Sequence, residues 1–342
     1  MKNLFLLILI VLIVFSQAMS FVSSKKAGVA SGLPIIYWST DLNPARIEQI
    51  AIFRKWLKKR GLPDVDVRLD TANAGLQKAI IQTVTGAAAD VMDMGSGSIQ
   101  LLQEMGVLRD MSEVDREFGY KYEDMYEPTL NDIMIAGKHY GFPCNIGLAS
   151  LVVNVDTFRK VGMDTPPFRN DFESFEAIGR EFVTRANAGK KRRDSFFFDG
   201  HQFELMRRSL GISYLNETLT RSMIDCPEFI RVLKLGLRWT DELHLVPSAA
   251  EVASISIEQG YGGSSFQLFN HGNFAMMMTG RWAMIQIRNM GAKYPISIIE
   301  FPNGGYPNAM AMSRSVVVYQ GTKNPDAAKY FCAFLRSEDY NM

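Results

Sequence analysis

The stretch FNHGNFAMMMTGRWAM, residues 269–284, decides the fold of this chain. A polar turn precedes the continuous apolar run 274–278, and Thr279 and Gly280 end that run. A short apolar run between turn residues is typical of a buried strand, and Trp282 lies at the start of a new helical pattern. The stretch therefore predicts a strand–turn–helix unit. Thr279, Gly280 and Trp282 would lie at the carboxyl end of the strand, where open α/β sheets bind their ligands.

Apolar runs and helical patterns also alternate through the first hundred residues. Each predicted strand is followed by turn residues and then by a helix with apolar positions three or four residues apart. This βαβαβ order predicts a parallel sheet covered by helices, and hence an α/β fold. The predicted strands are residues 33–38, 65–69 and 90–94, and the predicted helices begin at Pro44, Ala74 and Ile99.

A glycine- and serine-rich turn, Gly95-Ser96-Gly97-Ser98, follows the third of these strands. Backbone amides before a helix can bind anions. The turn nevertheless lacks the Lys-Ser/Thr ending of a nucleotide P-loop and the third Gly of a dinucleotide motif. We therefore expect no nucleotide here. Ser98 is placed to cap the next helix, and Ser96 either hydrogen-bonds a ligand hydroxyl or belongs to a plain helix cap.

Three further motifs lie elsewhere in the chain. KHYGFP predicts a hairpin tip and the start of a crossing strand, PNGG a loop after a strand, and NPDAA the start of an amphipathic helix. They occupy residues 138–143, 302–305 and 324–328, and the strands and helices predicted around them cover 148–153, 174–185, 295–301, 311–319 and 327–335.

Taken together, these segments resemble the extracellular solute-binding proteins of ABC transporters, specifically the sugar-binding family 1. In their order along the chain, the family patterns are G-K-x-Y-G-x-P, F-x-x-G-x-x-A-M-x-x-x-G-x-W-A, P-x-P-x-G-G and N-x-E-A-A-x-x-F. The resemblance spans residues 33–340. The chain departs from the family at Val153, where Tyr is usual, and at residues 172–174, where Phe-Glu-Ser replaces Thr-Trp.

The resemblance implies a two-lobe, type II periplasmic-binding-protein fold, in which each lobe has a mixed sheet flanked by helices. The first lobe would comprise residues 33–143 and 302–342, and the second lobe residues 144–301. The hinge would cross near residues 143–145 and again near 299–302. Family members generally continue with further C-terminal helices, and the chain is expected to lack them because it stops at residue 342.

The resemblance also implies a ligand site between the lobes. In the family, the tryptophan that Trp282 matches stacks on the sugar; a core tryptophan at a helix start is the alternative reading of Trp282. Polar groups around the ring would hydrogen-bond the sugar hydroxyls. The expected ligand-binding residues are Asp41, Ser96, Asn145, Asp199, Thr279, Gly280 and Trp282.

The amino terminus predicts export. Lys2 precedes the apolar stretch 4–15, and the small residues Ala18 and Ser20 follow it. Together these are the three parts of a secretory signal peptide. The stretch is shorter than the roughly 20 residues of a membrane span. We expect cleavage after Ser20 and a periplasmic or extracellular protein, with an uncleaved anchor as the alternative.

Composition narrows the partners further. The 37 Lys and Arg residues balance 36 Asp and Glu residues, so a nucleic-acid partner is not expected. Cys144, Cys226 and Cys332 are too few for a disulfide framework, although one bridge is open to them. The four histidines have no metal-ligand spacing. We expect no metal, no cofactor and no catalytic residue.

The function that the resemblance implies is capture of a sugar or oligosaccharide between the lobes and delivery to the membrane permease of an ABC importer, by a monomer. Two other functions stay open at this point. One is an exported glycan-active hydrolase that uses Asp199 or Glu300, since fold alone does not decide function. The other is the sensory lobe of a signalling system.

Overall fold

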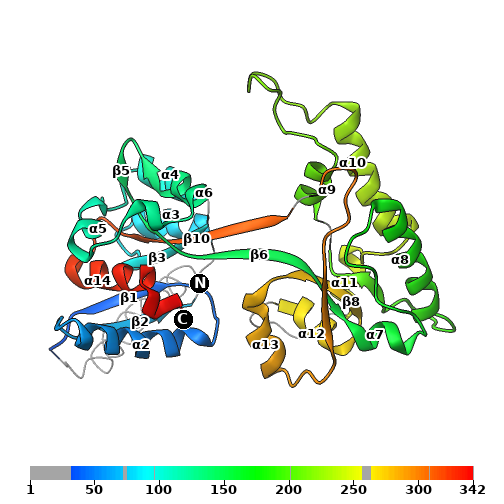
Figure 1. Ribbon diagram of the computed structural model, residues 1–342, viewed down its shortest axis with the longest axis horizontal. Helices are drawn as coiled ribbons and strands as arrows, with labels where there is room; N and C mark the ends of the chain where they lie inside the picture. The colour runs from blue at the N-terminus through cyan, green and yellow to red at the C-terminus, as the bar shows by residue number, and fades with distance from the viewer. Residues whose placement is uncertain are drawn as a thin grey trace, which may run out of the picture.

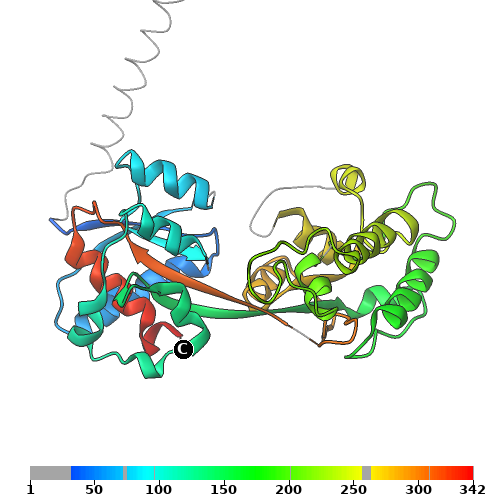
Figure 2. The same cartoon turned by 90° about the horizontal axis from the view of Figure 1, so that it is seen from above.

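The computed structural model describes residues 32–71, 75–95, 97–200, 202–255, 263–307 and 309–341. These residues form two α/β lobes joined by two long strands, β6 (Phe142–Asn154) and β10 (Met310–Val318), as Figure 1 shows. Seen from above, the same two strands connect the lobes (Figure 2). The predicted two-lobe α/β fold is therefore confirmed. The predicted signal peptide, residues 1–20, lies outside the described residues.

The strands of the first lobe follow the predicted βαβαβ order. The strands β1 (Ile35–Ser39), β2 (Asp66–Asp70) and β3 (Val91–Gly95) are parallel, within two residues of the predicted bounds. Strand β10 pairs antiparallel with β3, and β6 pairs antiparallel with β10, so the sheet of this lobe is mixed in the order β2-β1-β3-β10-β6.

Helices and a short hairpin complete the first lobe. Ser98 is the first residue of its helix and does not cap it, because Gly97 takes the cap position in a left-handed conformation (φ 82°) without a side-chain bond. The capping prediction was therefore wrong. The elements are α2 (Ala45–Lys59), α3 (Leu76–Val84), α4 (Ser98–Glu104), α5 (Ser112–Phe118), η1 (Tyr122–Asp124), α6 (Glu127–Ile133), β4 (Met134–Ile135), β5 (Lys138–His139), α14 (Pro325–Arg336) and α15 (Glu338–Asn341).

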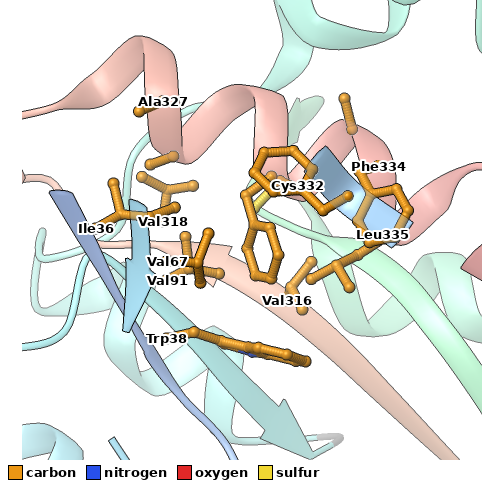
Figure 3. Packing of buried hydrophobic residues seen from close by; sticks show 14 of the residues in the cluster. Ile36, Trp38, Val67, Val91, Val316, Val318, Ala327, Cys332, Phe334 and Leu335 are labelled. Atoms are coloured by element: carbon orange, nitrogen blue, oxygen red, sulfur yellow. The ribbon is translucent and has the colours of Figure 1, made fainter. Parts of the chain in front are cut away.

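The core of the first lobe joins the two ends of the chain. Figure 3 shows side chains of α14 packed over those of the parallel strands. Phe331 of α14 lies edge-on to both Trp38 of β1 and Phe53 of α2, with ring centroids 4.9 Å apart in each pair. The amphipathic pattern of the NPDAA helix therefore buries its apolar face against strands about 290 residues earlier in the sequence.

The three cysteines carry free thiols, which answers the question that their spacing leaves open. Cys144 and Cys332 are buried in this first-lobe core, and Cys226 is partly buried in the second lobe. Burial raises the pKa of the Cys144 thiol to about 12. Both buried cysteines therefore behave as small apolar side chains.

The second lobe is built around the far half of β6. Strand β8 (Phe274–Thr279) confirms the strand predicted at 274–278. Both β8 and β9 (Ile296–Ile299) run antiparallel to β6. Strand β7 (Phe196–Phe198) runs parallel to β8. The helical elements of this lobe are α7 (Val155–Lys160), α8 (Phe172–Ala186), α9 (Phe203–Ser209), α10 (Pro227–Leu237), η2 (Arg238–Glu242), α11 (Ala249–Ile255), α12 (Gly263–His271), η3 (Arg281–Ala283) and α13 (Met284–Asn289). None of the helices in the described part of the chain is long and apolar enough to span a bilayer.

The return to the first lobe occurs later than residues 299–302. The amide of Asn303 donates to the carbonyl of Asn170 at 3.1 Å, and that of Tyr306 donates to the carbonyl of Ser209 at 2.9 Å, so this loop bonds to the second lobe. The chain then crosses in β10. These contacts favour β10 as the second crossing segment, while the exact bounds of the lobes stay a prediction.

Candidate functional site

The two crossing strands bring residues of both lobes onto one face. Asn145 of β6 lies directly opposite Arg314 of β10, and residues directly opposite in an antiparallel pair project on the same side. Gly147 is two residues further along β6, and therefore on that same side, about 7 Å away. This face of β6 and β10 is called the crossing face below.

Trp282 covers Gly147 on the crossing face. A Cβ at Gly147 would lie 2.8 Å from Cζ3 of the indole ring, and a Cβ at Gly280 would lie 2.1 Å from the same atom. The ring therefore sits where side chains at these two positions would be, which explains why both are glycines. Trp282 is partly buried, at the margin of a second-lobe hydrophobic cluster. It is thus neither a core residue nor a fully exposed one.

Thr279 and Gly280 lie at the carboxyl end of β8, as the sequence predicts. Thr279 pairs with Ser150 of β6, so the end of β8 adjoins the crossing strand. Its side chain is buried. Gly280 is held against the carbonyl oxygen of Leu148, which a Cβ would approach to 2.6 Å.

Asp199 follows β7 directly and reaches the neighbouring strand. Its Oδ1 accepts the backbone N–H of Met278 at 2.9 Å, one residue before Thr279. Burial raises the pKa of this carboxyl to about 7, although the Met278 hydrogen bond opposes the rise. A carboxyl with so strongly shifted a pKa, at the ends of two sheet strands, is a functional-site candidate on physical grounds.

Asp41 follows β1 and is held by two arginines. Its Oδ1 accepts from Nε of Arg46 at 2.9 Å, and its Oδ2 accepts from Nη1 of Arg314 at 2.6 Å. Burial raises the pKa of Asp41, but the two guanidinium groups outweigh it, and the net pKa is lowered. Asp41 is therefore a fixed carboxylate that reaches the crossing face through Arg314.

Asp93, in the middle of β3, completes this group. It is buried, with 2% of its side chain exposed, and it lies 3.2 Å from Nη2 of Arg314 and 3.8 Å from Nη2 of Arg46. It also accepts hydrogen bonds from Trp38 Nε1 at 2.8 Å and from Thr40 Oγ1 at 2.5 Å. Asp41, Arg46, Asp93 and Arg314 are called the charge tetrad below.

Sequence reasoning did not find Arg46, Asp93 and Arg314. One local signal was available: Asp93 stands alone within the apolar strand VMDMG, and a buried carboxylate needs a cationic partner. The identity of that partner had no local signal. Arg314 lies 273 residues from Asp41 in the sequence.

The structure thus brings most of the predicted residues to one region. The crossing face holds Asn145 and Trp282, and Asp41 reaches it through Arg314. The adjoining end of β8 holds Thr279, Gly280 and Asp199. Asn145 is exposed. Ser96 lies outside the described residues. Glu300 forms an ion pair with Arg169 at 3.2 Å.

Two surface hollows lie elsewhere on the molecule. One, of about 390 Å³, is lined by residues that include Arg180 and His244; the other, of about 430 Å³, by residues that include Tyr37 and Asp70. None of the predicted site residues lines either hollow. Within the described ranges, no group of three or more His, Cys, Asp or Glu side chains could hold a metal ion.

Sequence comparison identifies relatives over nearly the whole chain. A family model described as bacterial extracellular solute-binding protein matches residues 53–342. A Brucella abortus (strain 2308) protein described as a binding protein is 22% identical over 338 residues, which cover 92% of this chain and 78% of that protein. A Brucella suis biovar 1 (strain 1330) protein with the same description matches with the same identity and coverage.

Solved structures share the fold. An ABC substrate-binding protein from Listeria monocytogenes in complex with cycloalternan has a TM-score of 0.76 at 19% identity, covering 90% of this chain and 76% of that one. An ABC transporter solute-binding protein from Thermotoga lettingae, bound with α-D-tagatose, has a TM-score of 0.72 at 15% identity. The match covers 90% of this chain and 78% of that one. An ABC transporter solute-binding protein from Agrobacterium vitis, with bound D-mannitol, has a TM-score of 0.69 at 19% identity. The match covers 90% of this chain and 73% of that one.

Proposed function

Because the chain belongs to the bacterial extracellular solute-binding protein family, we propose that it captures a sugar, an oligosaccharide or a polyol between its two lobes and delivers it to an ABC importer. The family consists of binding proteins and not of enzymes, so the hydrolase hypothesis built on Asp199 or Glu300 is set aside. The ligands bound by the structural relatives from Listeria, Thermotoga and Agrobacterium support the choice of ligand class.

The observation that carries the proposal is the position of Trp282 over Gly147 on the crossing face. A sugar presents apolar C–H faces and a rim of hydroxyl groups. An indole ring would cover one such face, contributing about 0.5–1.5 kcal/mol beyond area burial by analogy with aromatic pairs. The exposed amide of Asn145, two residues before Gly147, and the guanidinium of Arg314 opposite it would face that rim. This combination fits a polyhydroxy ligand better than a purely apolar one.

Binding would be completed by closure of the lobes about the crossing strands. Two segments that link packed bodies are the usual arrangement of a hinge. Ligand would then be bound by Asp41 of the first lobe, by Asn145 at the crossing, and by Asp199, Thr279, Gly280 and Trp282 of the second lobe. The sequence adds Ser96, in the turn after β3, as an expected ligand residue. The closed form would be the one that the permease recognises. The predicted first lobe comprises residues 33–143 and 302–342, and the predicted second lobe comprises residues 144–301. We propose one change to these bounds: the second crossing lies in β10, so that the loop before it belongs to the second lobe.

Export and assembly belong to the same proposal. The segment 1–20 would act as a Sec-type signal peptide, so that the mature protein works outside the cytoplasmic membrane. It would act as a monomer that meets the permease subunits only on delivery. A sensory protein would use the same site with another partner, and stimulation of an ATPase-coupled permease in vesicles distinguishes the two roles.

The proposal is tested by a thermal-shift screen of the exported chain against maltotriose, D-mannitol and D-tagatose, with analysis of the incubated sugars for products. A ligand at about 100 times its Kd stabilises a protein by roughly 2.7 kcal/mol, enough to raise the melting temperature by a few degrees. Trp282→Ala should abolish the shift. Phe168→Ala, which removes an exposed second-lobe aromatic, is the control and should keep it. A shift that survives Trp282→Ala would contradict the proposed site.

A further inference from the structure

The charged side chains at the carboxyl ends of the first-lobe strands are all engaged in ion pairs. Three cationic side chains match three aspartates here: Asp41 after β1, Asp70 at the end of β2 and Asp93 within β3. This edge of the first-lobe sheet therefore carries balanced charge. The pairs are Asp41 with Arg46 (2.9 Å) and Arg314 (2.6 Å), Asp70 with Lys78 (3.3 Å), and Asp93 with Arg314 (3.2 Å) and Arg46 (3.8 Å).

Arg314 is the cation of the charge tetrad that projects from the crossing face, because it lies directly opposite Asn145. Its Nη1 donates to Asp41 and its Nη2 faces Asp93, so both ends of the guanidinium fork are occupied. A carboxylate or phosphate on a ligand binds arginine through this same fork. An anionic ligand that binds through Nη1 and Nη2 would therefore have to compete with Asp41, which is present at the high effective concentration of a group in the same chain.

The second lobe adds a further carboxylate. Asp199 contacts the Met278 amide, and no ion pair of Asp199 with a cation is among those of the described residues. Arg281, three residues after Met278 in the sequence, is exposed and precedes Trp282. When Asp199 is ionised, its negative charge repels an anionic ligand. The repulsion is stronger because Asp199 is partly buried and therefore less screened by water.

From these contacts we infer that the ligand is uncharged, and that Asp41 excludes acidic and phosphorylated sugars by occupying the guanidinium of Arg314. The inference rests on the proposed function and adds the charge class of the ligand to it. It also identifies Asp41 as a specificity-determining residue through a contact with Arg314, whatever hydrogen bonds Asp41 makes to the ligand itself.

The first experiment compares matched pairs of probes on the wild-type chain by calorimetry: D-mannitol against D-mannitol 1-phosphate, and maltotriose against its terminally oxidised acid. The neutral member should bind at least about tenfold more tightly, the scale of one charge-assisted hydrogen bond. Equal or tighter binding of the acidic member overturns the inference; if Arg281→Gln then removes that binding, Arg281 is the anion receptor. If none of the four probes binds, the result counts against the proposed function. The exclusion of anions by Asp41 is then decided by the second experiment.

The second experiment needs no sugar. Inorganic phosphate should bind Asp41→Asn at least about tenfold more tightly than it binds the wild type, because Nη1 of Arg314 is released. Adding Arg314→Gln should remove the gain. Asp66→Asn is the matched control: Asp66 also contacts two arginines, Arg54 at 3.7 Å and Arg68 at 3.1 Å, and is 26% exposed where Asp41 is 27% exposed.

Phosphate affinity that stays at the wild-type level in a folded Asp41→Asn chain overturns the inference. An equal gain in Asp66→Asn does so too, because any arginine freed from an aspartate would then suffice. Circular dichroism checks that each variant is folded. If Asp41→Asn does not fold, Asp41→Ser takes its place, and the comparison of neutral and acidic probes on the wild type stands without any variant.

Discussion

The indole ring of Trp282 occupies the space that a side chain at Gly147 would need, with Cζ3 only 2.8 Å from the position of a Cβ there. Trp282 belongs to the second lobe, whereas Gly147 lies on a strand that runs into both lobes. The proposed sugar platform is thus packed against the connection between the lobes. Movement of the lobes and occupancy of the ring are expected to influence each other.

Gly147→Ala should displace the ring and weaken ligand binding. The other three tryptophans, Trp38, Trp56 and Trp239, are fully buried, so acrylamide quenching of tryptophan fluorescence reports on Trp282. We expect increased quenching and at least tenfold weaker binding, because the added methyl group leaves no room for the ring. Gly200→Ala is the control, since nothing lies within 4 Å of its Cβ position. Quenching that does not change in Gly147→Ala would contradict this packing.

Arg314→Gln should destabilise the first lobe. It removes the cation nearest to Asp93, which stays buried with only the more distant Arg46 as a charged partner. Breaking a buried ion pair typically costs about 3–5 kcal/mol, and we expect the lower part of that range because Arg314 is 30% exposed. Urea unfolding measures the change. Arg68→Gln, at a side chain 29% exposed and paired with Asp66, should cost less than about 1 kcal/mol. Similar losses in the two variants would show that the tetrad has no special role in stability.

The stability of the second lobe should depend on pH through Asp199. The folded carboxyl has a pKa of about 7, against an ordinary value of 3.8, so between these values the folded state holds a proton that the unfolded state has lost. The free energy of unfolding therefore falls as pH rises from about 4 to 7, by up to about 4 kcal/mol at roughly 1.4 kcal/mol per pKa unit, and is then constant with respect to this group. Asp199→Asn should remove this slope. Denaturation of both proteins at pH 5 and pH 8 tests it, and a constant difference between them would refute the assignment.

Phe331→Ala should unfold the first lobe more readily. Phe331 is fully buried between Trp38 and Phe53, and truncation of a buried phenylalanine costs about 3–5 kcal/mol. Thermal denaturation should show the loss. Ile47→Ala on α2 is the control, because this side chain is 72% exposed and its removal should change stability by less than about 0.5 kcal/mol. A small effect of Phe331→Ala would mean that α14 is not needed to hold the first lobe together.

Much of the fold was predictable because its signals are local. The apolar run before Thr279 and Gly280 indicates β8, and the NPDAA motif indicates the start of α14, since each depends on periodicity and turn residues within about a dozen positions. The capping of α4 was not predicted correctly. Both Gly97 and Ser98 suit a helix start, and the left-handed backbone at Gly97 placed Ser98 inside the helix.

The site divides in the same way between sequence and structure. By itself the sequence determined that Asp41 and Thr279 follow or end strands, because a strand end is a local property of the chain. It did not predict β7, the three-residue strand that places Asp199. Only the tertiary structure decided that Arg314 holds Asp41, and that Trp282 lies on Gly147. These contacts join segments that are distant in sequence, and they depend on how the sheet orders its strands and on the register of β6 with β10. Neither the strand order nor the register has a local signal in the chain.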